Sequence, residues 1–181
     1  MPKPVNLPTL SGFGIQPPVY IHKIARGSNW VIEENVSDSI RHAVETIFKD
    51  SDYMYSFWLV GSDLDLYCVA ASLNADRDAP NEQINFIWLT HNDLEVLGLT
   101  ATQSQEGKCI YAQKLHYNIL VEPNKAQELC SLLMKNKRES VRCTKGAMKL
   151  IVTHNLGRGC KAYEYDNPPQ ECLCEMKEST S

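Results

Sequence analysis

The chain has 181 residues, a formal net charge of −4 and 43% apolar residues, the values of an ordinary globular protein. A chain of this length buries about 70% of the surface that its unfolded form exposes, so it folds without disulfides or metal. No apolar run approaches the roughly 20 residues that span a bilayer, and prolines stand where a signal peptide has its apolar core. Together with an odd number of cysteines, seven, this predicts a cytoplasmic protein with reduced thiols and no membrane partner.

The sequence divides into an arm, a domain and a tail. Residues 1–18 are rich in proline and glycine and predict an extended arm, which apolar side chains can pin to the surface. Residues 19–165 hold all the predicted elements and are expected to form a single domain. Residues 166–181 are polar and acidic, which predicts a loosely held tail.

In the first half of the domain, apolar periodicity and turn signals predict four strands and two helices. In chain order these are strand 19–24, helix 38–50, strands 53–60, 64–73 and 84–89, and the short helix 93–97. Gly61-Ser62-Asp63 joins two of the strands and favours an antiparallel hairpin. Thr90 and Gly98 are typical cap residues at the two ends of the short helix.

In the second half, strands outnumber helices. Residues 108–121 predict one long bent strand or two short ones, and Pro123 opens a helix to about residue 136. Further strands are predicted at 140–144, 148–153 and 161–165. Because several strands follow one another without a helix between them, the expected fold is α+β. Its mostly antiparallel or mixed sheet has six to eight strands, with two main helices packed on one face.

Asp63 and Asp65 form the first candidate site. Two carboxylates at i and i+2 of a strand point to the same face, so both can hold one Mg²⁺. The run from Gly61 to Leu66 resembles the nucleotidyltransferase signature, a Gly-Ser followed by Asp-x-Asp on the next strand. This resemblance implies Mg²⁺-dependent phosphoryl or nucleotidyl transfer. The helical spacer of that signature is missing, however, and the same letters suit a hairpin turn with Asp65 on the solvent face.

A cluster of thiols and one histidine near the C-terminus is the second candidate. Its members, His154, Cys160, Cys172 and Cys174, are enough for a tetrahedral zinc site. Their spacing differs from the usual paired knuckles, and thiols that merely happen to lie in a tail are the alternative. A third candidate, a Cys–His nucleophile pair, has no local motif that marks one thiol as activated.

Charge is distributed unevenly along the chain. Residues 27–106 carry three basic and 14 acidic side chains, whereas residues 125–161 carry nine basic and two acidic ones. The basic region predicts an anionic partner, and the candidate contacts are Lys135, Lys137, Arg138, Arg142, Lys145, Lys149 and Arg158. Alternatively, the acidic and basic halves complement each other within the fold or across a homodimer.

These observations favour a non-enzymatic accessory or regulatory binding protein that needs no cofactor. We expect it to contact an acidic protein surface, a nucleotide or a nucleic acid through the basic 135–161 region. The alternatives are a Mg²⁺-dependent transferase that uses Asp63 and Asp65, and a small zinc-stabilised interaction module.

Overall fold

The computed structural model describes residues 6–24, 44, 52–75, 82–106, 109–136, 138 and 141–157. At its centre is one six-stranded sheet in the order β4-β5-β2-β1-β3-β6, with every neighbouring pair antiparallel. The strands are β1 (Val19–Ile24), β2 (Met54–Val60), β3 (Ile84–Leu89), β4 (Ala101–Gln103), β5 (His116–Leu120) and β6 (Val141–Cys143). The predicted α+β class and antiparallel sheet are confirmed.

Three predicted segments lie outside the described residues. They are strand 161–165, tail 166–181 and helix 38–50, of which the structure describes Val44 alone, as a helical residue.

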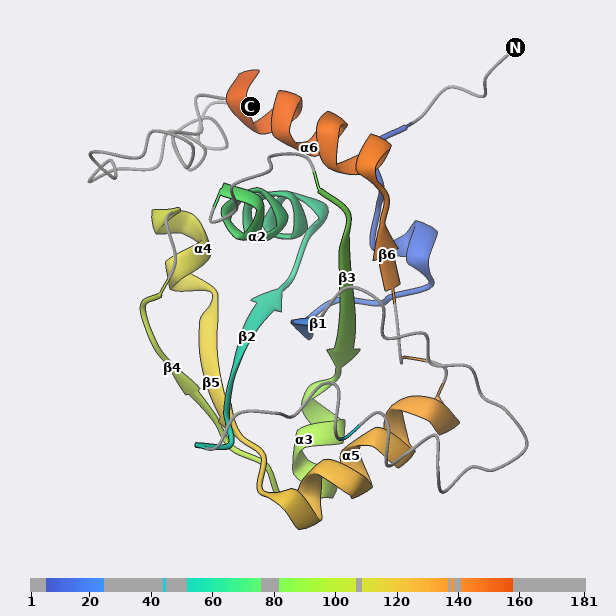
Figure 1. Ribbon diagram of the computed structural model, residues 1–181, viewed down its shortest axis with the longest axis vertical. Helices are drawn as coiled ribbons and strands as arrows, with labels where there is room; N and C mark the ends of the chain where they lie inside the picture. Colours follow the sequence, from blue (N-terminus) through green and yellow to red (C-terminus); the bar gives the residue numbers. More distant parts are fainter. Residues whose placement is uncertain are drawn as a thin grey trace.

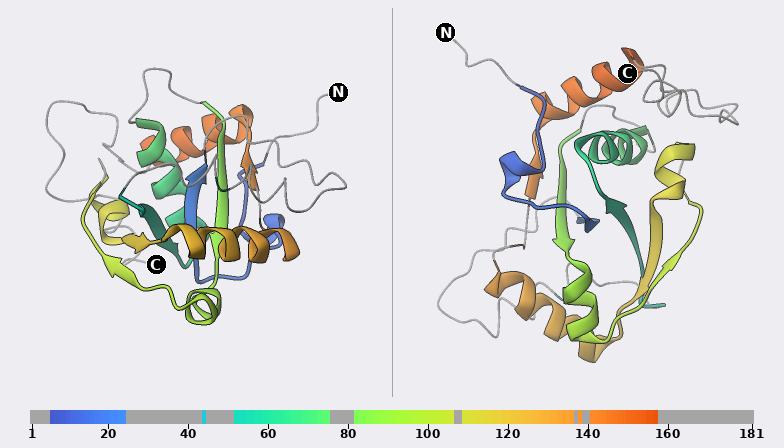
Figure 2. Two further views of the ribbon diagram at one scale, coloured as in Figure 1. Left: turned by 60° about the horizontal axis from the view of Figure 1, so that its bottom comes forward. Right: turned by 180° about the vertical axis from the view of Figure 1, so that it is seen from behind.

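Helices cover both faces of this sheet. They are α2 (Asp63–Ala75), α3 (His91–Leu97), α4 (Ile110–Lys114), α5 (Pro123–Lys135) and α6 (Lys145–Gly157). One apolar cluster joins α2, α4 and α6 to alternate strand residues such as Ile21 and Trp58, and a second joins α3 and α5 to Tyr20 and Phe57. Figure 1 shows α2, α4 and α6 in its upper part and α3 and α5 below, and the rear view on the right of Figure 2 shows the same two groups. The expectation of helices on one face was therefore wrong.

Helix α2 replaces the strand predicted at 64–73. Ser62 Oγ accepts a hydrogen bond from the Asp65 N–H at 3.2 Å and so caps the first turn. The helix is buried on almost every side, because it lies between the sheet, α4 and α6. An apolar run that is buried all round shows no 3.6-residue period, which is why it read as a strand.

Helix α6 replaces the strand predicted at 148–153, and α4 occupies part of the strand predicted at 108–121. Thr144 Oγ1 accepts a hydrogen bond from the Ala147 N–H at 3.2 Å at the start of α6. Met148, Ile151 and Asn155 are buried at helical spacing, and Asn155 donates to the Tyr67 carbonyl on α2 at 3.0 Å. Packing against α2 thus overrides the strand preference of the β-branched residues in this segment.

Helix α3 begins and ends at the cap residues that the sequence suggested. Thr90 Oγ1 accepts from the Asp93 N–H at 3.2 Å, and Asp93 accepts from the Thr90 N–H at 2.6 Å, which completes a capping box. Gly98 follows the helix at φ +64, a conformation that suits glycine. None of the described helices is long and apolar enough to cross a bilayer.

The N-terminal arm packs against α2. Leu10 and Ile15 are buried in the cluster beneath it. The Leu10 N–H donates to Asp63 Oδ1 at 2.7 Å, and the Tyr67 hydroxyl donates to the Pro8 carbonyl at 2.7 Å. Contacts to the first turns of α2 therefore hold this segment in place.

Candidate functional site

Asp63 and Asp65 accept hydrogen bonds from different parts of the chain. Asp65 is buried and accepts from the Gly61 N–H at 2.8 Å and from the Tyr111 hydroxyl at 2.7 Å, whereas Asp63 accepts from Leu10. Residues at i and i+2 of a helix do not face each other, so the expectation of one shared strand face was wrong. Asp65 also does not lie on a solvent face.

The second candidate site lies mostly outside the described residues. Of its four members only His154 is described, and its ring meets the Tyr67 ring edge-to-face with centroids 5.5 Å apart. Cys160, Cys172 and Cys174 belong to the part of the chain that is not described. Within the described ranges, no three His, Cys, Asp or Glu side chains come together as metal ligands.

The described cysteines form no disulfides and are buried: Cys68, Cys109, Cys130 and Cys143. Burial raises the pKa of the Cys130 and Cys143 thiols to about 12. Because the thiolate is the nucleophile, these two side chains are unsuited to nucleophilic chemistry near neutral pH.

The Arg138 side chain makes its contacts within the fold. Its guanidinium forms an ion pair with the buried Asp93 carboxylate and lies 4.2 Å from the centroid of the Trp88 ring. These contacts tie the segment after α5 to β3 and to the start of α3. They are a sufficient structural reason for an arginine at this position.

Three other predicted contacts lie on β6 and α6. Lys145 and Lys149 are exposed and one helical turn apart, and Arg142 is exposed on β6. Lys145 Nζ lies 3.4 Å from Glu82 Oε1, and Arg142 donates to Gln83 Oε1 at 2.6 Å. Because these partners are consecutive residues, Arg142 and Lys145 have their charged groups near the same place.

Of the remaining basic candidates, Lys135 is the one that the structure describes. Lys135 is on α5, which covers the opposite face of the sheet from α6, and lines an open groove between α3 and α5. Lys137 and Arg158 lie outside the described residues.

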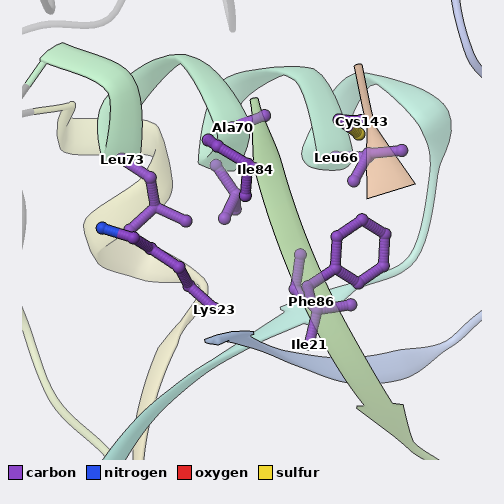
Figure 3. Close-up of a pocket in the computed structure, with 9 residues that line it drawn as sticks. Ile21, Lys23, Leu66, Ala70, Leu73, Ile84, Phe86 and Cys143 are labelled. Atoms are coloured by element: carbon purple, nitrogen blue, oxygen red, sulfur yellow. The ribbon is translucent and has the colours of Figure 1, made fainter. Parts of the chain in front are cut away.

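A small apolar hollow lies between α2 and the sheet (Figure 3). Its lining includes Ile21, Leu66, Ala70 and Phe86, with Lys23 as its only charged side chain. The hollow encloses about 10 Å³, room for no more than one water molecule. It is a packing defect of the core and too small to be a substrate site.

The structure also brings together Ser104, His116 and Glu106. Ser104 Oγ lies 2.6 Å from His116 Nδ1, and Glu106 Oε2 lies 3.8 Å from His116 Nε2. This cluster was not predicted, because Ser104 and Glu106 lie between the predicted elements. The pairing of β4 with β5 places Ser104 opposite His116. Because a strand was predicted where α4 lies, the turn that brings β5 back alongside β4 was not expected.

No protein-family model, characterised protein or solved structure matches this chain.

Proposed function

We propose that the protein binds an anionic partner through its α6 surface, which consists of Arg142, Lys145 and Lys149. The partner is an acidic protein surface, a nucleotide or a nucleic acid. The observation that carries the proposal is the pair of exposed lysines one turn apart, in a segment, 141–157, that contains no aspartate or glutamate. The positive end of the α6 dipole lies at Lys145 and adds to their potential.

Glu82 lies next to Lys145 but leaves Lys145 and Lys149 accessible to a partner. Lys145 is 68% exposed, so its contact with Glu82 is screened by water and contributes little to stability. An incoming phosphate or carboxylate can therefore replace Glu82 at small cost. Among the described residues, Lys149 has no ion-pair partner.

The alternatives receive less support from the geometry. The Asp63 and Asp65 carboxylates are engaged in hydrogen bonds within the fold, so Mg²⁺-dependent transfer is not proposed. The zinc-stabilised module and the homodimer stay predictions.

Charge reversal on two helices with equal change in net charge tests the proposal. The Lys145→Glu/Lys149→Glu variant is compared with Lys125→Glu/Lys135→Glu on α5, using a fluorescent single-stranded 20-mer DNA and a polyglutamate peptide as probes. On α6 the change should weaken binding at low salt. It should also reduce the slope of log K against log[NaCl] for the DNA by about 1.4, since two phosphate contacts are lost.

The α5 variant serves as the control for net charge. It should keep the salt dependence of the unmodified protein, because its lysines lie on another face. Equal loss of binding in both variants would mean that net charge alone causes the loss, and would contradict a site on α6.

A further inference from the structure

The Ser104–His116–Glu106 cluster has a hydrogen-bond arrangement that the proposed binding function does not require. β4 and β5 lie side by side in the sheet (Figure 1), and Ser104 directly follows β4 where His116 begins the antiparallel β5. The Ser104 N–H donates to the His116 carbonyl at 2.9 Å, so the backbone fixes the two side chains relative to each other. Their side-chain distance of 2.6 Å is short for a hydroxyl and an imidazole nitrogen.

The charge of Glu106 favours one tautomer of the His116 ring. Its carboxylate lies 3.8 Å from Nε2, within ion-pair range and beyond a hydrogen bond. An N–H facing a carboxylate is favoured over a lone pair facing it, so this arrangement favours the tautomer with the proton on Nε2. Nδ1 then has its lone pair directed at Ser104 Oγ and can accept the hydroxyl proton.

The surroundings hold the ring in this position and in its basic form. His116 is 1% exposed, and its ring meets the Trp58 ring at 5.0 Å between centroids, inclined by 71°. Burial lowers the pKa of His116, whereas Glu106 partly opposes that change. Ser104 is half-buried, and the Glu106 side chain is 62% exposed. These two residues therefore lie at the surface, whereas the His116 ring is buried behind them.

We propose that Ser104 is a nucleophile activated by His116, with Glu106 as a positioning residue, and that it takes an acyl group from an activated ester. The proton of Ser104 Oγ passes to His116 Nδ1 as the Oγ–C bond forms. The ester C–O bond then breaks, and the leaving oxygen receives the proton from Nδ1 and departs as an alcohol. Compared with serine proteases, the two ring nitrogens have exchanged roles.

This site is separate from the α6 surface. Ser104 and His116 belong to the β4–β5 edge of the sheet, and α6 follows β6 at the other edge. Charge reversal on α6 leaves the cluster intact, so either proposal can fail without the other.

An alkyl fluorophosphonate tests the nucleophile. Attack forms an Oγ–P bond and breaks the P–F bond, so fluoride leaves with the serine proton. We expect one adduct per chain on the peptide that contains Ser104, located by mass spectrometry, and its loss in Ser104→Ala. Ser131→Ala is the matched control, because the Ser131 hydroxyl donates to the Gln127 carbonyl on the surface of α5, and it should label like the unmodified protein.

His116→Gln should slow labelling by about 100-fold, the usual contribution of a general base. Because this buried substitution can also unfold the chain, labelling is measured only on protein with an unchanged circular dichroism spectrum. Glu106→Ala provides the independent variant, since its side chain is exposed. It should slow labelling about fivefold, and added formate should restore the rate.

A purely structural role for Glu106 predicts no rescue by formate. Release of p-nitrophenol from p-nitrophenyl acetate provides the matching ester readout, and an acetyl group on Ser104 is the expected product. Absence of any Ser104 adduct in the folded unmodified protein, or equal labelling of Ser104→Ala, would overturn the proposal.

Discussion

The Asp65 carboxylate uses both of its oxygens as hydrogen-bond acceptors, from the Gly61 N–H and the Tyr111 hydroxyl. Asp65→Asn replaces one acceptor by an NH₂ group that faces a donor. We expect the free energy of unfolding to fall by about 1–3 kcal/mol, measured by urea denaturation. Asp52→Asn, on an exposed residue, should change it by less than about 0.5 kcal/mol. Equal values for the two variants would mean that these hydrogen bonds contribute nothing.

Single residues were predicted well where the information is local, and poorly where it depends on partners far along the chain. Thr90 and Gly98 cap α3 as expected, because both cap signals lie within a few residues of the helix. The environment of Asp65 depends on Tyr111, 46 residues away, and that of Arg138 on Asp93, 45 residues away. Neither partner can be identified before the fold is known, so the role of both side chains was open.

At the level of elements, amphipathic segments were predictable and fully buried ones were not. β1 and β3 have the predicted bounds, and α5 agrees to within one residue. α5 shows its buried side at helical spacing, since one face is exposed. α2 is covered on almost every side, and the β-branched residues of α6 read as a strand, so both were assigned wrongly. For these two helices, the sequence features that indicate a helix are the cap residues at their N-termini, Ser62 and Thr144.

Helix α6 should therefore depend on its cap. Thr144→Ala removes the hydroxyl that accepts the Ala147 N–H, and should lower the free energy of unfolding by about 1 kcal/mol. Thr153→Ala is the matched control, because that hydroxyl donates to the Lys149 carbonyl within the helix and caps nothing. Thermal unfolding followed at 222 nm measures both. A loss as large in Thr153→Ala would contradict the cap as the cause.

At the scale of the whole molecule, the oppositely charged parts of the chain meet in ion pairs of two kinds. The ion pairs of Arg138 with Asp93 and Lys145 with Glu82 each join the basic part of the chain to the acidic part. Their burial differs, however. The Arg138 and Asp93 side chains are 16% and 7% exposed, whereas Lys145 is exposed. The buried pair belongs to the fold, whereas the exposed cations of the α6 surface are where we propose that a partner binds.

Because the Arg138 side chain is largely buried and Lys149 is exposed, alanine substitutions of the two residues should have different effects. Arg138→Ala leaves the buried Asp93 carboxylate without its cation and removes the contact with Trp88, so the free energy of unfolding should fall by about 3 kcal/mol. Lys149→Ala should change it by less than about 0.5 kcal/mol while weakening binding of the DNA probe. Urea denaturation and a binding titration on the same samples separate the two effects. If Arg138→Ala lost only binding, its ion pair would not be part of what holds the fold together.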